Sequence, residues 1–159
     1  MRTYKGKYKV KNPEKYEGNT SEVVYRSQWE KYCMMFFDTN VRVKKWSSEE
    51  IIIPYLYEVD KRHHRYYPDF KVTWLNGQVS LIEVKPFKET RPPTGSKRTK
   101  RYITEGYTFV KNVNKWEAAH EYCKDRKWKF EIWTENELDS LGIKPKSTKL
   151  LKPYSRKTK

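Results

Sequence analysis

Cysteine and long apolar stretches are the scarcest features of this 159-residue chain. Its two cysteines, Cys33 and Cys123, are too few for a disulfide framework or a four-cysteine zinc site. We interpret them as buried free thiols in a reducing cytoplasm. The longest apolar run, residues 33–37, is far shorter than the about 20 residues of a membrane span. Because residues 1–10 also lack the apolar segment of a secretory signal, the sequence predicts no membrane association.

Acidic residues are few beside basic ones. The chain has 20 Asp and Glu against 35 Lys and Arg, which gives a formal charge of +15. The mean hydropathy of −1.08 would by itself suggest disorder. Aromatic residues make up 16% of the chain, however, and Tyr and Trp bury large rings while keeping a polar tip. The composition therefore favours one folded domain with a strongly basic surface.

The positive charge is concentrated in three clusters. Residues 1–15 hold six Lys or Arg, residues 85–101 hold seven, and residues 144–159 hold seven more. Such clusters neutralise phosphates, so DNA is the first partner to expect. Solubilising tails are an equal explanation for the two terminal clusters. We expect a basic arm over residues 1–18, a folded domain over 19–143 and a flexible basic tail over 144–159.

Hydrophobic periodicity predicts an α/β fold. A helix is expected over residues 21–37, opened by Asn19, and a second helical region over 101–113 followed by a separate helix from Asn114. A short helix opened by Thr134 and ended by Gly142 is expected last. Strands are expected over 51–57, 66–75, 79–84 and 128–133. The resulting order, α-βββ-αα-β-α, favours a mixed four-stranded sheet flanked by helices.

Two acidic motifs lie across the predicted hairpin of the second and third strands. Asp69 follows a proline, and Glu83 lies two residues before Lys85 at the end of an apolar strand. Cleaving a phosphodiester requires a hard divalent cation, and Mg²⁺ takes oxygen ligands from one or two carboxylates. We predict that Asp69 and Glu83 bind Mg²⁺, with Mn²⁺ able to substitute, and that Lys85 orients or deprotonates the attacking water. Glu30, at the edge of the first helix, is a third acid within reach of the metal.

This hypothesis depends on the hairpin register. A strict two-residue turn at 76–77 would place Asp69 and Glu83 on opposite faces of the sheet. A shared metal therefore requires an odd-length loop, such as 76–78, or a β-bulge. With the 76–78 loop, Asp69 would lie opposite Lys85 and diagonal to Glu83. Without this irregularity, the acids would be ordinary solvated residues at strand ends.

Other polar residues have weaker claims to function. His63 and His64 are expected in a solvated turn, with a phosphate contact as the alternative. Glu49 and Glu50 are interpreted as surface charge rather than as acids near a metal. The cations after Lys85 are better candidates for contacts with the DNA backbone. These predicted DNA-binding residues are Lys88, Arg91, Lys97, Arg98, Lys100 and Arg101.

Several of these motifs together resemble a known family. The segments 25–30, 65–69, 82–86 with 88–93, and 130–135 are similar to the PD-(D/E)xK nuclease superfamily and, more narrowly, to the head-completion nucleases of T-even-like phages, which are related to TnsA endonucleases. The resemblance implies a restriction-endonuclease-like core. It assigns Asp69 and Glu83 as metal ligands, Lys85 as the catalytic lysine and Glu30 as the helix acid.

The same resemblance implies a Mg²⁺-dependent DNA nuclease that acts late in phage assembly and leaves a 5′-phosphate and a 3′-hydroxyl. It would work in the cytoplasm of the infected cell or with the virion, alongside phage head or neck proteins. No base-reading element is visible, so we expect structure preference rather than sequence specificity. Two alternatives stay open at this point: a non-catalytic DNA-binding head-completion protein, and a repair or junction-resolving nuclease.

Overall fold

A mixed four-stranded sheet forms the centre of the computed structural model, which describes residues 5–143. The strands lie in the order β3-β6-β7-β8, and only the β7–β8 pair is parallel. The elements are β1 (Gly6–Lys7), η1 (Pro13–Lys15), η2 (Thr20–Glu22), β2 (Val24–Tyr25), α1 (Gln28–Thr39), β3 (Val43–Ser48), β4 (Ile53–Tyr57), β5 (Arg62–Tyr66), β6 (Phe70–Trp74), β7 (Val79–Val84), η3 (Phe87–Thr90), α2 (Lys100–Arg126), β8 (Lys129–Trp133) and α3 (Glu135–Ser140). The predicted α/β class and mixed sheet are thus confirmed.

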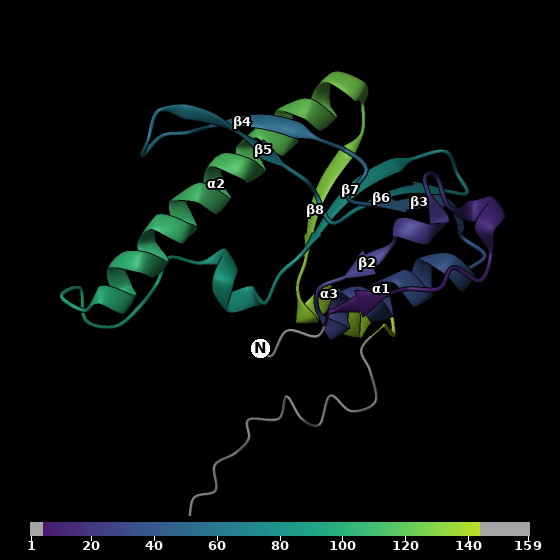
Figure 1. Cartoon of the computed structure of the whole chain (residues 1–159), viewed down its shortest axis with the longest axis horizontal. Coiled ribbons are helices and arrows are strands. Elements are labelled where there is room, and N and C mark those ends of the chain that lie inside the picture. The colour runs from purple at the N-terminus through teal and green to yellow at the C-terminus, as the bar shows by residue number, and fades with distance from the viewer. Residues whose placement is uncertain (1–4, 144–159) are drawn as a thin grey trace, which may run out of the picture.

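Each face of the sheet is covered by its own hydrophobic core. Helices α1 and α3 lie on one side, while α2 and the β4–β5 hairpin lie on the other (Figure 1). The α1 core is built around the aromatic rings of Phe37, Trp46 and Phe70, with Phe37 and Phe70 5.0 Å apart between ring centroids. The α2 core includes Leu81 and Trp116. Consecutive residues of β7 therefore alternate between two buried environments, which explains its continuous apolar sequence.

The first helix begins later than predicted. Residues 20–25 form the short η2 helix and strand β2, and α1 starts at Gln28. Its N-cap is Ser27, whose hydroxyl accepts a hydrogen bond from the Glu30 N–H at 3.2 Å. Asn19 instead caps the short helix η2, because its side chain accepts a hydrogen bond from the Ser21 N–H at 3.0 Å. The capping pattern at Asn19 was therefore assigned to the wrong element.

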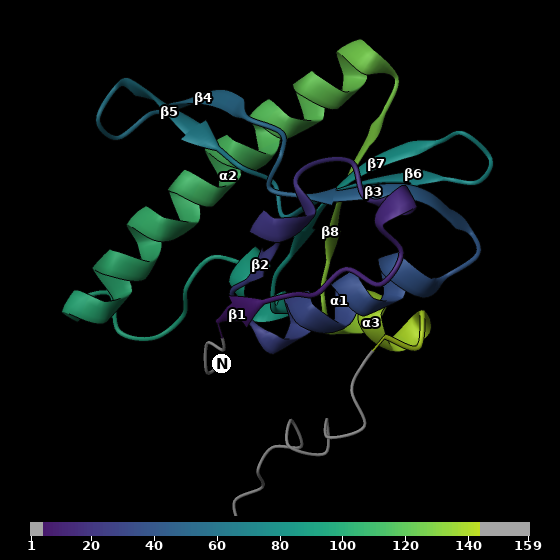
Figure 2. The ribbon, with the colours of Figure 1, turned by 45° about the vertical axis from the view of Figure 1, so that its right-hand side comes forward.

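The predicted strand over 51–57 exists as β4, but it does not belong to the central sheet. It pairs with β5 in a separate hairpin that lies along α2 (Figure 2). This corrects the expectation of a solvated turn around His63 and His64, which lie in β5. The edge of the main sheet is instead β3, a strand that the sequence did not predict. Its sequence, VKKWSS, lacks apolar alternation, and only contacts with distant elements bury Trp46 completely.

The two predicted helices after residue 100 are one continuous helix, α2, which has 27 residues. Asn114 does not cap a new helix: its side chain donates to Glu58 at 2.9 Å and accepts from the Glu58 N–H. Tertiary contacts along α2 outweigh the cost of Gly106 in its interior. The α3 prediction is confirmed, since Thr134 and Glu137 form a capping box and Gly142 follows the helix with φ +70°.

The N-terminal segment packs against the α1 core and is not a separate arm, since Tyr8 and Tyr16 are buried in that core. The Tyr8 hydroxyl donates to Asp38 at 2.7 Å, and the backbone N–H groups of Lys11 and Asn12 donate to the same carboxylate. Arg2 of the basic N-terminal cluster and the predicted tail 144–159 lie outside the described residues. Among residues 5–143, no helix is long and apolar enough to span a membrane.

Candidate active site

The β6–β7 hairpin places the two predicted metal ligands face to face. Phe70 pairs with Ile82, and continuing this antiparallel register by one residue sets Asp69 opposite Glu83. Directly opposed residues share one face of a sheet and have Cβ atoms about 5 Å apart. Both acids therefore lie at the end of β6 and β7 on the α2 side, where their side chains converge.

The predicted odd-length loop is confirmed, but its position differs. Trp74 donates its N–H to the Gln78 carbonyl at 2.8 Å, so the loop consists of residues 75–77 instead of 76–78. Gly77 adopts φ +90°, a conformation that favours glycine. Moving the loop by one residue along the chain changes the residue that lies opposite Asp69 by two positions. Asp69 consequently faces Glu83 directly, whereas the 76–78 loop would have set it opposite Lys85.

Hydrogen bonds orient both carboxylates. Asp69 Oδ2 accepts from the Val84 N–H at 2.8 Å, and Glu83 Oε1 accepts from the Tyr66 hydroxyl at 2.6 Å. The Lys85 ammonium lies 3.6 Å from Glu83 Oε2, as expected for residues two apart on a strand. Glu83 is only 9% exposed, so its position is fixed by packing as well as by these bonds.

Glu30 approaches this pair from the start of α1. It is half-buried, as predicted, and its Oε1 accepts a hydrogen bond from the Arg26 N–H at 3.0 Å. The Arg26 guanidinium forms a bidentate pair with Glu49 at 2.9 Å, and the Glu49 N–H donates to the Asp69 carbonyl at 3.1 Å. Glu49 is thus part of the scaffold of the site, which corrects its interpretation as surface charge.

All three acids have raised pKa values. Burial is the largest cause in each case. The negative charges of Glu83 and Glu30 raise the pKa of Asp69 further. The charges of Glu49 and Glu83 do the same for the pKa of Glu30. Lys85 and Tyr66 oppose the rise for Glu83. Converging buried carboxylates of this kind are poised to accept a cation.

The donor set fits a hard divalent cation. Asp69 and Glu83 offer carboxylate oxygens on one face, and Mg²⁺ is usually bound by one or two carboxylates while keeping several waters. Within residues 5–143, no group of three His, Cys, Asp or Glu side chains is arranged as a preformed metal cage. The geometry therefore supports a two-carboxylate site, and the role of Glu30 as a third ligand stays a prediction.

Two side chains that contact the candidate site were not anticipated from the sequence. Tyr66 holds Glu83, and the Lys115 ammonium of α2 lies 5.5 Å from the centroid of the Tyr66 ring. Burial lowers the pKa of Lys115, while the Glu83 carboxylate opposes this. The position of Tyr66 three residues before Asp69 was a usable signal. The sequence carries no such signal for Lys115, because only the crossing of α2 over the sheet brings this residue to the acids.

The six cations predicted to bind DNA are all exposed, and they follow Lys85 along η3, the next loop and the start of α2. Arg91 lies over the Phe87 ring at 4.9 Å, and Arg101 pairs with Glu105 at 3.0 Å. The His64 ring, in contrast, is held within the hairpin: its Nε2 lies 2.8 Å from Asp60 Oδ2, and the ring stacks on Tyr55. An exposed basic surface therefore begins beside the acids and extends from Lys88 to Arg101.

An α/β core with two opposed acids and a lysine on adjacent strands defines the class of PD-(D/E)xK-type nuclease folds. Residues 40–135 match the family model described as TnsA-like endonuclease N terminal. The chain is also 39% identical over 148 residues to the head completion nuclease of Enterobacteria phage T4, covering 89% of this chain and 97% of that protein. The chain therefore belongs to the TnsA-like endonuclease family. No solved structure matches it significantly.

Proposed function

We propose that this chain is a metal-dependent DNA endonuclease that acts in phage head completion. The observation that carries the proposal is the convergence of Asp69 and Glu83, close enough for the Glu83 charge to raise the pKa of Asp69, with Lys85 3.6 Å from Glu83. A protein that only binds DNA has no use for buried acids beside its phosphate-contacting cations, because the acids repel the phosphates. The similarity to a phage head completion nuclease supports the same activity.

Mg²⁺ would be held by Asp69 and Glu83, with Mn²⁺ able to replace it. The bound metal supplies a Lewis acid that polarises the phosphate and makes water nucleophilic near neutral pH. Glu30 lies close enough to affect the pKa of Asp69, and we assign it to bind the metal directly or through water. Burial raises the pKa of both carboxylates, and the charges of Glu83 and Glu30 raise the pKa of Asp69 further, so a bound cation would stabilise their charged forms.

The chain's own residues perform the other parts of the reaction. Lys85 is placed to orient or deprotonate the attacking water and to offset charge on the scissile phosphate. Tyr66 keeps Glu83 in one orientation through its 2.6 Å hydrogen bond. Lys115, which approaches from α2, adds a second cation on the same side of the site. Together they would stabilise the extra negative charge that develops on the phosphate.

The substrate is DNA, held through its phosphates by the exposed cations from Lys88 to Arg101. These residues contact charge and shape instead of base edges, so the enzyme should prefer a DNA structure over a base sequence. By analogy with its relative, the protein would act in the cytoplasm of the infected cell, or in association with the virion, next to head or neck proteins.

A cleavage assay with Mg²⁺ on linear, branched and overhanging DNAs tests this function. The wild type should cut at least one of these DNAs, and both Asp69→Ala and Lys85→Ala should abolish cutting. Asp125→Ala, which removes an exposed carboxylate on α2, is the matched control and should cut normally. Cutting that survives both site variants would refute the assigned site. A wild type that cuts none of the DNAs but binds them would identify a non-catalytic DNA-binding protein.

A further inference from the structure

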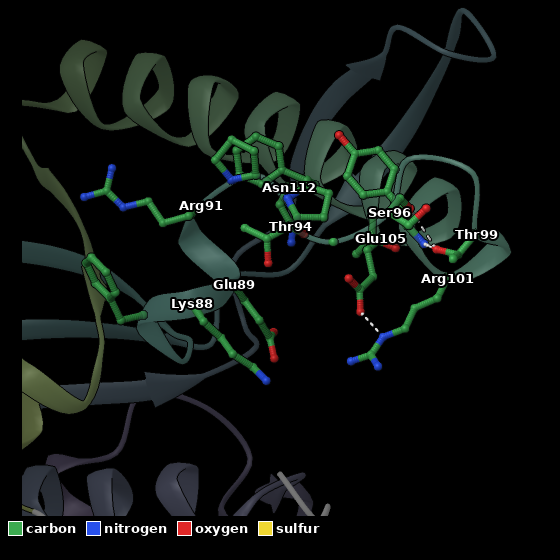
Figure 3. Close-up of a pocket in the computed structure, with 16 residues that line it drawn as sticks. Lys88, Glu89, Arg91, Thr94, Ser96, Thr99, Arg101, Glu105 and Asn112 are labelled. Carbon is green, nitrogen blue, oxygen red and sulfur yellow. Dashed lines mark hydrogen bonds and ion pairs between the residues drawn. The ribbon is translucent and has the colours of Figure 1, made fainter.

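A pocket of about 890 Å³ lies directly beyond the acidic site along the chain. One wall is the segment from Phe87 to Ser96, and the other is the first half of α2 (Figure 3). The α2 residues that line it recur at helical spacing, so they form one side of the helix. Aromatic rings from both walls line the pocket, namely Phe87, Tyr102 and Phe109.

Asn112 of α2 also lines this pocket. Its residue is only 6% exposed, and nothing within residues 5–143 hydrogen-bonds to its side chain. The buried side-chain polar atoms that lack a partner within residues 5–143 are the Nε1 atoms of Trp46 and Trp116, so the Asn112 amide is instead open to the pocket that it lines. The amide offers both a donor and an acceptor, the same combination that the edge of a nucleobase presents. An Asn amide that is open to a cavity with aromatic walls suits a planar polar ligand.

Part of the pocket lining is positively charged. Lys88 and Arg91 line it without an ion-pair partner among the described residues, and the Arg91 guanidinium covers the Phe87 ring. The Arg101 guanidinium is neutralised by Glu105, and Glu89 is the other acid in the lining. Cations beside aromatic rings are the combination that binds single-stranded nucleic acid, through its phosphates and its bases.

The pocket and the acidic site share two structural elements. Phe87 follows Lys85 by two residues, which ties one wall to the catalytic strand. On α2, Asn112 lies three residues before Lys115, a rise of about 4.5 Å along the helix axis. Lys115 contacts the Tyr66 ring, and Tyr66 holds Glu83. A DNA strand lying across the acids would therefore reach the pocket within a short distance.

We propose that this pocket receives one unpaired nucleotide of the DNA substrate, next to the phosphate that is cut. The inference rests on the proposed nuclease function and specifies its substrate: DNA with an overhang, a flap or a frayed end beside the cleavage position. Phe87, Tyr102 and Phe109 surround the base, and Asn112 hydrogen-bonds to its edge. Lys88 and Arg91 bind the flanking phosphates.

Binding measured in EDTA tests the pocket separately from cleavage. The probe is a duplex whose single-stranded overhang carries the fluorescent base 2-aminopurine, and a blunt duplex with the same label is its partner. With wild-type protein we expect quenching of the overhang probe and an affinity at least about five-fold higher than for the blunt duplex. A protein that shows this preference but cuts no DNA would support the proposed nucleotide pocket and would overturn only the nuclease proposal.

Variants identify the residues responsible. Phe87→Ala removes a ring that is 41% exposed and should leave the fold intact, and Asn112→Ala removes the amide that lines the pocket. Each should lower the overhang preference at least about five-fold, while Asn136→Ala, a control on α3 with an exposed side chain, should keep it. Equal binding of blunt and overhanging DNA by the wild type, or a preference unchanged in both variants, would overturn the proposal.

Competition with free deoxyadenosine monophosphate distinguishes a pocket for DNA from one for small nucleotides. We expect millimolar nucleotide to leave the bound overhang in place, because the flanking phosphates of the strand supply much of the affinity. Protection of the pocket by the free nucleotide without any overhang preference would contradict the assignment to a DNA strand. Quenching that disappears with an acidic or apolar peptide as competitor would contradict it in favour of a protein partner.

Discussion

The phenol of Tyr66 donates a 2.6 Å hydrogen bond to Glu83 Oε1, from the last residue of β5 to the central strand β7. This bond ties the β4–β5 hairpin to a carboxylate that we assign to metal binding. It leaves Glu83 Oε2 facing Lys85 at 3.6 Å. The hairpin, which lies outside the central sheet, therefore helps to orient the active site.

Tyr66→Phe should lower the cleavage rate while leaving DNA affinity unchanged. The substitution removes only the hydroxyl that orients Glu83, and removing such a second-layer contact at a metal site costs about 10–100-fold in metal affinity or activity. Raising the Mg²⁺ concentration should recover part of the rate. Cleavage measured over a Mg²⁺ titration checks this, with Tyr67→Phe, which alters an exposed ring, as the control. An unchanged Mg²⁺ dependence would contradict the role of Tyr66.

Asp69→Asn should abolish cleavage yet stabilise the metal-free protein near neutral pH. Burial and the charges of Glu83 and Glu30 raise the pKa of Asp69, so the folded state binds this proton more tightly than the unfolded chain does. The stability of the metal-free wild type should thus fall as pH rises from about 4 through the raised pKa. The Asn variant should lose this part of the pH dependence.

Thermal unfolding between pH 4 and 8, with EDTA and with Mg²⁺, measures both effects. Mg²⁺ should raise the melting temperature of the wild type more at pH 8 than at pH 5, because it binds the deprotonated carboxylates. The same addition should have little effect on Asp69→Asn. A Mg²⁺ effect of equal size in the two proteins would rule out Asp69 as a ligand.

Lys115→Gln should reduce cleavage by about 100-fold with a much smaller effect on DNA affinity. Its ammonium lies beside Tyr66 on the side of the acids, where a cation stabilises charge that develops as the phosphate reacts. Lys111→Gln is the matched control one turn earlier on α2, since that ammonium lies over the Tyr57 ring at 4.9 Å, away from Glu83. Single-turnover rates at saturating DNA separate the two variants. Equal losses in both would mean that Lys115 contributes only general positive charge.

Neutralising three cations between residues 97 and 100 should weaken DNA binding and make the affinity less dependent on salt concentration. The triple variant Lys97→Gln, Arg98→Gln, Lys100→Gln leaves the pocket lining untouched. Each lost phosphate contact should reduce the slope of log affinity against log salt by about 0.9. Lys124→Gln, Lys127→Gln, Lys129→Gln makes the same charge change at the other end of α2 and should leave the slope close to that of the wild type. Equal slopes for the two triple variants would place the DNA elsewhere.

Asp38→Ala should destabilise the fold by about 3 kcal/mol. The buried carboxylate accepts hydrogen bonds from Tyr8, Lys11 and Asn12, and its loss would leave these donors unsatisfied. Denaturant unfolding measures the change, with Asp125→Ala as a surface control that should stay within about 0.5 kcal/mol of wild type. Proteolysis near residue 12 should also become faster. Resistance equal to that of the wild type would contradict anchoring of the N-terminal segment by Asp38.

Local chemistry made much of this protein predictable. The odd-length β6–β7 loop followed from the need to bring Asp69 and Glu83 to one face, and the side chains of consecutive strand residues alternate whatever surrounds them. The two-residue spacing of Glu83 and Lys85 fixed their shared side in the same way. Thr134 and Glu137 form a capping box within four residues, so α3 was also determined locally.

Tertiary structure decided what depends on contacts between distant segments. The strand β3 has little intrinsic preference for its place, and it becomes an edge of the sheet because Trp46 packs against Phe37 and Phe70. The continuous α2 likewise forms despite Gly106, since its second half packs against β4 and β8. Lys115 and Asn112 receive their places only from the path of this helix. Short-range sequence thus specified the acids and the lysine, while long-range packing, whose partners lie too far apart in the sequence to be inferred from it, specified the second cation and the adjoining pocket.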